Sequence, residues 1–272
     1  MSSLNILITG QEGFIGRSVL NKIQENHGNK FNEILLFEKS DIDSDINWVS
    51  NLENAVERSD IVLHIGADSS TQNPNFNEVL FYNYYFSKIL FDFVGQSEKK
   101  VIYSSSAACY GTEGTPSTIY GWSKYLAEQY GYIKNKNFYA LRYFNVYGPG
   151  ESEKGNMASV ANQAILSGKN SFKLFPGKPL RDFIYIDDVV SANIYPIMNE
   201  VESGIYDVGS GIQNTFENVL EILNIDIEYH LETSIPDNYQ FSTLADKQKF
   251  LKGWKPEFSL EKGLKEYKKI IK

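Results

Sequence analysis

The 272-residue chain contains one cysteine, Cys109, and three histidines, His27, His64 and His230. A single cysteine excludes an internal disulfide and any cysteine-cluster metal site. The three histidines are scattered along the chain and do not have the spacing of a histidine-based zinc site. We therefore expect no disulfide and no bound metal.

Positive charge and long apolar runs are also scarce. Lys and Arg number 26 against 34 Asp and Glu, which gives a formal net charge of −8. This charge argues against a nucleic-acid or anionic-membrane surface as the main binding function. The apolar runs are only a few residues long, whereas a bilayer-spanning helix needs roughly 20. No basic-then-apolar signal precedes Leu4, so we expect a cytoplasmic protein without a nucleic-acid or membrane partner.

Short, continuous apolar segments alternate with helical patterns in the first half of the chain. Continuous apolar strands separated by helices are typical of a parallel sheet covered by helices on both faces. The pattern thus predicts a doubly wound α/β domain over residues 1–150. The expected strands lie at residues 4–9, 33–38, 60–66, 100–106 and within 138–148, with helices near 51–58, 75–95 and 120–134.

The pattern loosens after residue 150. Polar loops, an isolated strand over residues 172–175 and a final helix over 258–271 indicate a smaller C-terminal α/β lobe, mainly residues 151–272. A segment near 182–210 is expected to return to the first domain.

The first expected strand runs directly into the segment GQEGFIG. We expect Gly10 to allow the tight turn, Gly13 to let the backbone approach a pyrophosphate, and Gly16 to let helix and strand pack closely. The N-terminus of the following helix then offers N–H groups to the phosphates. In this position, the pattern predicts dinucleotide binding.

The second expected strand ends at Glu38, where an acidic residue typically holds the adenosine ribose hydroxyls and repels a 2′-phosphate. Asp41, Asp43 and Asp45 follow in what we expect to be a solvated acidic loop. Lys39 is the only cation in that stretch and could bind a phosphate instead. The electrostatics favour NAD over NADP and leave Lys39 as the basis of the NADP alternative.

Tyr120 and Lys124 are one helical turn apart, so their side chains share one helix face. An ammonium beside a phenol lowers the phenol pKa from about 10 toward neutral, which suits general acid–base catalysis. On spacing alone, a surface helix pair is the better interpretation. However, the fourth strand ends in SSSAACYG, which places Ser106 at the carboxyl edge of the sheet, where such sheets bind ligands. A serine there can donate a hydrogen bond to a substrate oxygen.

The segments GQEGFIG, SSSAACYG and YGWSK, in this order and spacing, resemble the extended short-chain dehydrogenase/reductase family of nucleotide-sugar enzymes. The resemblance covers nearly the whole chain. It implies a Rossmann domain that binds NAD or NADP and a C-terminal domain that binds a nucleotide sugar. It also implies that Tyr120 takes a hydroxyl proton while a hydride moves to the nicotinamide, that Lys124 lowers the tyrosine pKa and holds the nicotinamide ribose, and that Ser106 orients the same oxygen.

The resemblance also narrows the reaction. The sugar 4,6-dehydratases of the family carry an Asp-Glu pair after the catalytic Ser or Thr. Ala107 and Ala108 follow Ser106 here, which argues against a dehydratase. The segments HIGADSST, NYYFSK, RYFNVYGPG, KGNMASV and KLFPG with RDFIYIDDV resemble the ADP-L-glycero-D-manno-heptose 6-epimerases. In that group the lysine matched by Lys154 is a second catalytic base opposite the tyrosine. Without the resemblance, a lysine in a glycine-flanked polar loop would be read as solvated.

Further site residues follow from the same resemblance. The candidates for cofactor binding are Gly10, Gly13, Phe14, Ile15, Gly16, Glu38, Lys39, Gly66, Ala67, Asp68, Asn83, Tyr120, Lys124 and Val146. The candidates for substrate binding are Asn145, Asn156, Gln163, Phe175, Arg181 and Tyr239.

Among these, Arg181 suits a diphosphate, because its planar guanidinium matches paired phosphate oxygens. Its alternative is a structural ion pair with Asp182 or Asp187. Asn156 and Gln163 replace the Ser and the frequent His of the heptose epimerases, and that group commonly uses NADP. The base and sugar of the substrate, and the choice between NAD and NADP, therefore stay open.

The leading interpretation is an NAD(P)-dependent nucleotide-sugar epimerase of the heptose 6-epimerase type. A 4-epimerase or a 4-keto-sugar reductase acting on another nucleotide sugar is the enzymatic alternative. A non-enzymatic NAD(P)-binding sensor is the alternative of another class, but such proteins usually lack the active-site Tyr and Lys. The oligomeric state, including a homo-oligomer, stays open.

Overall fold

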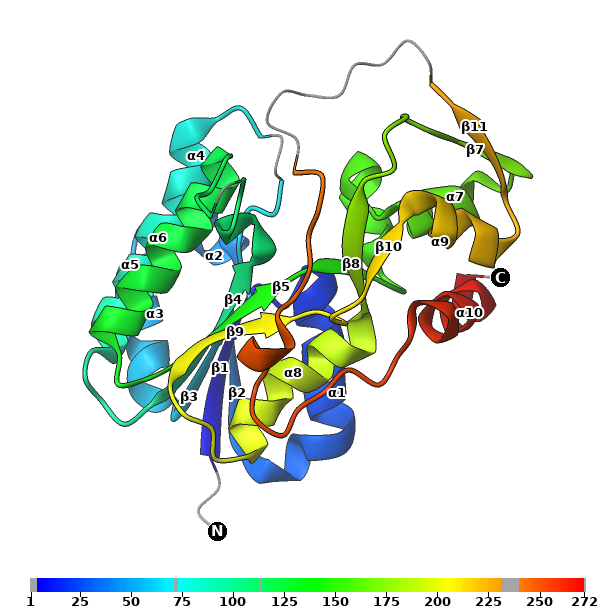
Figure 1. The fold of residues 1–272 in the computed structure, drawn as a ribbon. Helices are drawn as coiled ribbons and strands as arrows, with labels where there is room; N and C mark the ends of the chain where they lie inside the picture. The colour runs from blue at the N-terminus through cyan, green and yellow to red at the C-terminus, as the bar shows by residue number, and fades with distance from the viewer. Residues whose placement is uncertain (1–3, 71–72, 113, 231–239, 272) are drawn as a thin grey trace. The chain divides into compact units, whose positions relative to one another are not determined.

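The structure is a computed structural model that describes residues 4–70, 73–112, 114–230 and 240–271. The chain divides into two compact units. Unit 1 consists of Met1–Arg142 and Val190–Tyr206, and unit 2 of Tyr143–Val189 and Asp207–Lys272. Figure 1 follows the path of the chain through them. The assignment of cofactor to one part of the chain and nucleotide sugar to the other stays a prediction.

A six-stranded sheet, in the order β2-β1-β3-β4-β5-β9, forms the core of unit 1. β1 pairs in parallel with β2 and with β3, and β3 pairs in parallel with β4. The predicted α/β fold with a parallel central sheet is thus confirmed. The strands are β1 (Leu4–Thr9), β2 (Phe31–Phe37), β3 (Ile61–His64), β4 (Lys100–Ser106), β5 (Asn137–Tyr143) and β9 (Gly204–Val208).

Helices cover both faces of this sheet, with α3, α5 and α6 on one side and α1 on the other (Figure 1). Burial of apolar side chains drives this packing. Leu52 and Val56, four residues apart on α3, lie in one buried cluster with Leu90 of α5 and Val101 of β4. The helical segments are α1 (Phe14–His27), α2 (Lys39–Ser44), α3 (Trp48–Arg58), α4 (Phe76–Leu80), the π-helical turn η2 (Phe81–Tyr85), α5 (Phe86–Val94), α6 (Ile119–Lys134) and the 3₁₀ turns η1 (Gly28–Lys30) and η3 (Ala107–Cys109).

The order of the strands in the sheet indicates where a ligand would bind. After β1 the chain adds β2 on one side, and then returns to add β3 on the other side of β1. Open α/β sheets bind ligands beyond the carboxyl ends of the strands at such a change of direction. Gly10 directly follows β1 there, and Gly66 lies just beyond β3.

Three expected segments differ in detail from the structure. The helix expected over residues 75–95 is interrupted by the π-helical turn η2. The segment 138–148 contains the expected strand, β5, which ends at Tyr143, and also a second short strand, β6 (Asn145–Tyr147), that belongs to another sheet. The acidic segment after Glu38 is the short helix α2 and not a loop, since Glu38 and Asp41 form a capping box at its start.

Unit 2 contains two small sheets. In the first, β8 lies between β10, to which it is antiparallel, and β6, to which it is parallel. In the second, β7 and β11 are parallel. The elements are β6 (Asn145–Tyr147), η4 (Glu151–Met157), α7 (Val160–Ser167), β7 (Ser171–Leu174), β8 (Leu180–Tyr185), β10 (Gln213–Thr215), α9 (Phe216–Leu223), β11 (Asp226–Tyr229), η5 (Lys247–Lys249) and α10 (Leu260–Ile271). The helix α8 (Ile186–Met198) begins in unit 2 and belongs to unit 1 from Val190 on. Within the described ranges, no helix has both the length and the apolar content to cross a bilayer.

Candidate active site

The glycine loop between β1 and α1 has three glycines with different surroundings. Gly10 has a φ of +77°, and a Cβ on it would lie 2.3 Å from the backbone of Gly66. A Cβ on Gly16 would lie 1.9 Å from the carbonyl oxygen of Gly10, so the loop and α1 meet backbone to backbone. The nearest atom to a Cβ on Gly13 is the same carbonyl oxygen, at an ordinary 3.5 Å. The loop is therefore closed at Gly10 and Gly16 and has room at Gly13.

The start of α1 fits a pyrophosphate. Gly13 is the N-cap residue and provides no side-chain hydrogen bond to the helix. The first turn, with Ile15 and Gly16, presents backbone N–H groups at the positive end of the helix dipole. With the space beside Gly13, these residues could hold the phosphates of a dinucleotide.

Glu38, at the end of β2, is connected to this loop. Its carboxylate accepts hydrogen bonds from the N–H of Glu12, at 2.6 Å, and from the N–H of Lys39, at 3.3 Å. Burial raises the pKa of the Glu38 carboxyl, and these backbone hydrogen bonds oppose the rise. Glu38 therefore lies beside the glycine loop, where a ribose-binding carboxylate belongs.

Lys39, the candidate ligand for a 2′-phosphate, is engaged by acidic neighbours. Its ammonium lies 3.3 Å from the carboxylate of Glu78 and 4.1 Å from the ring centre of Tyr82. The hydroxyl of Tyr82 donates to Asp43 at 2.5 Å. A 2′-phosphate at this position would meet a mainly negative surrounding, which favours NAD over NADP.

Asn83 organises the other side of the candidate cofactor site. Its fully buried side chain accepts from the N–H of Asp68 at 2.7 Å, and donates to the carbonyl of Asp68 and the hydroxyl of Ser123, both at 3.0 Å. Gly66 and Ala67 belong to the loop that Asn83 holds in this way. The π-helical turn that carries Asn83 thus connects this loop to α6.

Three predicted catalytic residues lie in unit 1, at the carboxyl end of β4 and in the first turns of α6. Thr118 caps α6 by accepting a hydrogen bond from the N–H of Gly121 at 3.0 Å, which fixes the helix start. The hydroxyl of Ser106, at the end of β4, accepts a hydrogen bond from the N–H of Ala108 at 3.1 Å, and the Ser106 side chain lowers the pKa of Tyr120 in the first turn of α6. Lys124, one turn further along α6, is buried, with its amine 4.6 Å from the ring centre of Tyr103.

Burial dominates the acid–base properties of this group. It raises the pKa of Tyr120 to about 12, and the Ser106 side chain opposes the rise. It lowers the pKa of Lys124 to about 8. The sequence predicts a phenol acidified by Lys124, whereas burial has the largest effect here and leaves the pKa of Tyr120 above its usual value. A phenolate here needs a further positive charge.

In unit 2, the predicted second base lies in the 3₁₀ turn η4. Lys154 is half-buried, and burial lowers the pKa of its amine while the charge of Glu151 opposes this. The amide of Gln163 donates to the carbonyls of Asn156, at 3.2 Å, and Ala158, at 2.8 Å. Gln163 therefore holds the turn that carries Lys154, and Asn156 is exposed on it.

The remaining substrate candidates lie on β6, β8 and the segment before β8. Arg181 donates to the carbonyl of Leu180 at 2.9 Å, and its guanidinium lies 5.9 Å from the ring centre of Phe216. The Phe216 ring also contacts Phe175 edge to face, at 6.2 Å between centres. Phe216 at the start of α9 thus connects two predicted residues that are distant in sequence.

Asn145 and its neighbour Val146 are half-buried on β6, and Asn145 accepts a hydrogen bond from the hydroxyl of Thr243 at 3.3 Å. The carboxylate of Asp182 accepts from the N–H groups of Gly211, at 2.8 Å, and Ala245, at 3.0 Å. Asp182 therefore ties two loops of unit 2 to β8. Tyr239 lies outside the described residues.

The comparisons with known proteins decide the family. Residues 6–209 match the NAD dependent epimerase/dehydratase family. The chain belongs to this family.

Particular members of the family are similar over most of the chain. An ADP-L-glycero-D-manno-heptose-6-epimerase from Cupriavidus pinatubonensis is 33% identical over 79% of this chain and 76% of that protein. The crystal structure of the Helicobacter pylori ADP-L-glycero-D-manno-heptose-6-epimerase has a TM-score of 0.80 and 28% identity, covering 99% of this chain and 96% of that one. The Thermotoga maritima UDP-glucose 4-epimerase, crystallised with UDP-glucose, has a TM-score of 0.81 and 27% identity, covering 98% of both chains.

Two buried residues, Glu128 and Arg142, are not among the site residues that the sequence predicts. Glu128 of α6 is fully buried and receives a bidentate pair of hydrogen bonds from Arg142 of β5, at 2.8 and 2.6 Å. It also accepts from the hydroxyl of Ser105 at 2.7 Å. The signal was the position of Glu128, one turn after Lys124 on the same helix face. Together with Ser105, the pair connects β4, α6 and β5.

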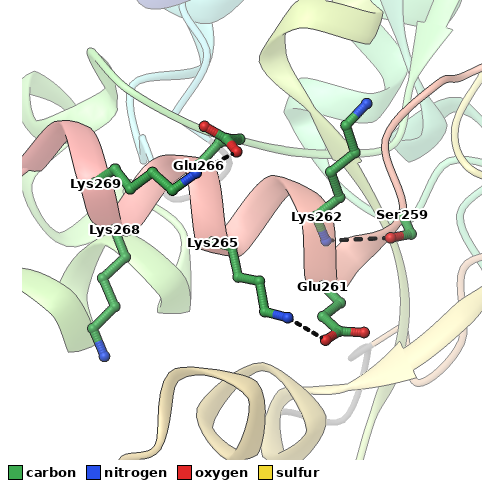
Figure 2. A pocket seen from close by; sticks show the side chains of 7 residues that line it. All are labelled: Ser259, Glu261, Lys262, Lys265, Glu266, Lys268 and Lys269. Atoms are coloured by element: carbon green, nitrogen blue, oxygen red, sulfur yellow. Dashed lines mark hydrogen bonds and ion pairs between the residues drawn. The ribbon is translucent and has the colours of Figure 1, made fainter.

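A hollow of about 490 Å³ lies along α10 (Figure 2). None of the residues that line it is a predicted site residue. Its charged side chains pair along the helix, with Lys265 2.5 Å from Glu261 and Lys269 2.7 Å from Glu266. Over the described ranges, no group of three or more His, Cys, Asp or Glu side chains could hold a metal ion. The chemistry of the protein is therefore argued from the glycine loop, the Ser106 and Tyr120 pair, and the Lys154 turn.

Proposed function

We propose that the protein is a nucleotide-sugar epimerase of the ADP-L-glycero-D-manno-heptose 6-epimerase type that works with bound NAD. The observation that carries the proposal is the KGNMASV segment, residues 154–160, which runs from the end of η4 to the start of α7 and carries a half-buried Lys154. The 33% identity to a heptose 6-epimerase supports it. A cytoplasmic location stays a prediction from the sequence.

The first half of the reaction is assigned to unit 1. When bound, NAD⁺ would supply a hydride acceptor and a positive charge that would favour the phenolate form of Tyr120. Tyr120 takes the proton from the sugar hydroxyl, and Ser106, whose side chain lowers the pKa of Tyr120, orients the same oxygen. Lys124, with its pKa lowered to about 8 by burial, holds the ribose next to the nicotinamide.

The second half of the reaction needs another acid. Inversion at the oxidised carbon requires the hydride to return to the opposite face of the carbonyl, so the oxygen is protonated from a different direction. We assign this proton to Lys154. Burial lowers the pKa of its amine, which makes the proton easier to give up.

Substrate and cofactor contacts follow from charge. Arg181, on β8 beside Phe216, is proposed to bind the diphosphate, because its fork of N–H donors matches paired phosphate oxygens. Glu38 is proposed to bind the adenosine ribose hydroxyls. Because Lys39 is engaged by Glu78, we propose NAD as the preferred cofactor.

A second candidate function is 4-epimerisation of another nucleotide sugar, supported by the 27% identity to a UDP-glucose 4-epimerase. A 4-keto-sugar reductase would consume its reduced cofactor stoichiometrically, whereas an epimerase recycles it. A sensor would bind the cofactor without turnover, which the presence of Ser106, Tyr120 and Lys124 disfavours.

The proposal is tested by incubating the purified protein with ADP-, GDP-, UDP- and dTDP-sugars and analysing products by mass spectrometry and NMR. We expect a product of unchanged mass, inverted at C6 of an ADP-heptose, without net consumption of cofactor. Inversion at C4 of a different nucleotide sugar would replace the heptose assignment with the second candidate. A mass gain of two hydrogens would identify a reductase. The same preparation gives the oligomeric state by light scattering.

A further inference from the structure

Glu151, three residues before Lys154, is a fully buried carboxylate in the 3₁₀ turn η4. One of its oxygens accepts from the N–H of Gly148 at 3.0 Å and from the hydroxyl of Ser159 at 2.8 Å. The other accepts from the N–H of Ser159 at 2.7 Å. The carboxylate therefore joins the two ends of the segment 148–159, which carries Lys154 between them.

The same segment is attached to two helices. Ser159 caps α7, because its hydroxyl accepts from the N–H of Asn162 at 3.2 Å while donating to Glu151. The amide of Asn162 donates to the hydroxyls of Ser152, at 3.0 Å, and of Tyr267 in α10, at 2.6 Å. Glu151 is thus the centre of a polar network that fixes the segment on α7 and α10.

The backbone of the segment explains why it needs such an anchor. Gly150 has a φ of +97° and Gly155 a φ of +53°, so Lys154 lies between two glycines in left-handed conformations. Glycines in such turns lose the most conformational freedom on ordering. A buried carboxylate without hydrogen bonds would itself be costly, and here hydrogen bonds from both ends of the segment offset that cost.

We propose that Glu151 is a positioning residue for Lys154, holding the segment 148–159 in the one conformation that presents the Lys154 amine for proton transfer. The proposal rests on the proposed function, in which Lys154 protonates the returning oxygen. Glu151 does not touch the reacting atoms in this assignment. Its effect on the reaction therefore passes through Lys154 alone.

The test compares Glu151→Gln with Lys154→Met. An amide of the same shape keeps the volume of Glu151 but turns an NH₂ group toward backbone and hydroxyl donors, so the segment loses part of its anchor. Two readouts are taken with the nucleotide sugar. Reduced-nicotinamide absorbance after mixing reports the first hydride transfer, and the ratio of epimers reports the complete reaction.

We expect Lys154→Met to lose epimerisation by about 10²-fold or more while retaining the first hydride transfer. Glu151→Gln is expected to show the same separation of the two readouts, with epimerisation reduced at least about tenfold. Equal losses in both readouts, or wild-type epimerisation, would overturn the positioning role.

Asp188→Asn is the matched control for a structural effect. Asp188 is also buried in unit 2 and accepts two backbone N–H groups, those of Glu257 at 2.8 Å and Phe258 at 3.0 Å. We expect this variant to lose thermal stability without separating the two readouts. If it separates them as Glu151→Gln does, the effect is structural and the proposal is wrong.

Two further arms keep the outcomes distinct. Ser159→Ala removes one donor to Glu151 and serves if Glu151→Gln does not fold; a smaller separation in the same direction is expected, and none would contradict the proposal. Lys154→Met with wild-type epimerisation would remove the second base and therefore the proposed function. If Lys154→Met separates the two readouts and Glu151→Gln does not, only the proposed role of Glu151 is wrong.

Discussion

The pKa of the Tyr120 phenol is too high for a proton acceptor at neutral pH. Burial raises this pKa to about 12, and the Ser106 side chain opposes the rise only in part. A positive charge on a ligand bound beside Tyr120 would lower this pKa. This predicts that the acid–base function of Tyr120 appears only in the loaded enzyme.

Tyr120→Phe is expected to reduce epimerisation by about 10²-fold or more, because the ring remains while the proton acceptor is lost. Folding, measured by circular dichroism, and cofactor binding, measured by calorimetry, are expected to persist. Tyr125→Phe is the matched control, since it removes a hydroxyl from the same helix outside the predicted site. Near wild-type turnover in Tyr120→Phe would contradict the assigned mechanism.

The acidic surrounding of Lys39 leads to a prediction for the cofactor. Glu38, Asp43 and Glu78 surround the position where a 2′-phosphate would add about two negative charges. We expect protein stripped of nucleotide to bind NAD at least about tenfold more tightly than NADP in calorimetry, a difference of about 1.4 kcal/mol. Lys39→Gln should leave the NAD affinity unchanged. Tighter binding of NADP, lost in Lys39→Gln, would instead make Lys39 a phosphate ligand.

At the scale of elements, the sequence predicted those strands and loops whose structure depends on residues close together in the chain. The expected strands at residues 4–9 and 100–106 coincide with β1 and β4, because continuous apolar runs specify a strand buried on both faces. The glycine loop follows in the same way, since only glycine permits the approach of Gly10 to Gly66. Ser106 and Tyr120 then come together because β4 and α6 end and begin beside each other.

Elements that depend on distant contacts were not predictable. The π-helical turn within residues 75–95 carries Asn83 to the backbone of Asp68, 15 residues earlier, and no local pattern indicates that contact. The buried pair of Glu128 and Arg142 likewise forms only when β5 lies next to β4. In the sequence, Arg142 is an ordinary charged position, and Glu128 is marked only by its place one turn after Lys124.

The same limit applies to the candidate site in unit 2. Lys154 was found only through a resemblance, because a lysine between polar residues has no local mark of a base. Glu151, its anchor, becomes visible once Gly148 and Ser159 are seen to meet one carboxylate. Sequence reasoning thus identified the residues named by motifs and missed those that hold them in place.

At the scale of the whole molecule, the predicted binding residues fall into different units. The glycine loop, Ser106, Tyr120 and Lys124 belong to unit 1, whereas Lys154 and Arg181 belong to unit 2. If unit 1 binds NAD and unit 2 supplies the diphosphate contact, each ligand should stabilise the protein through a different set of side chains. Thermal unfolding can separate the two contributions, because a ligand at about 100 times its Kd adds about 2.7 kcal/mol to the free energy of unfolding.

We expect NAD and the nucleotide sugar each to raise the Tm of the wild-type protein by roughly 5–10 °C at that concentration, given about 2–4 °C per kcal/mol for chains of this size. Gly13→Val should abolish the shift with NAD and keep that with the nucleotide sugar, because its Cβ is tolerated at 3.5 Å from Gly10 while its methyl groups fill the space proposed for the pyrophosphate. Arg181→Gln should do the reverse. Loss of both shifts in either folded variant would show that the two ligands depend on a common set of residues, and the division of binding between the units would then be wrong.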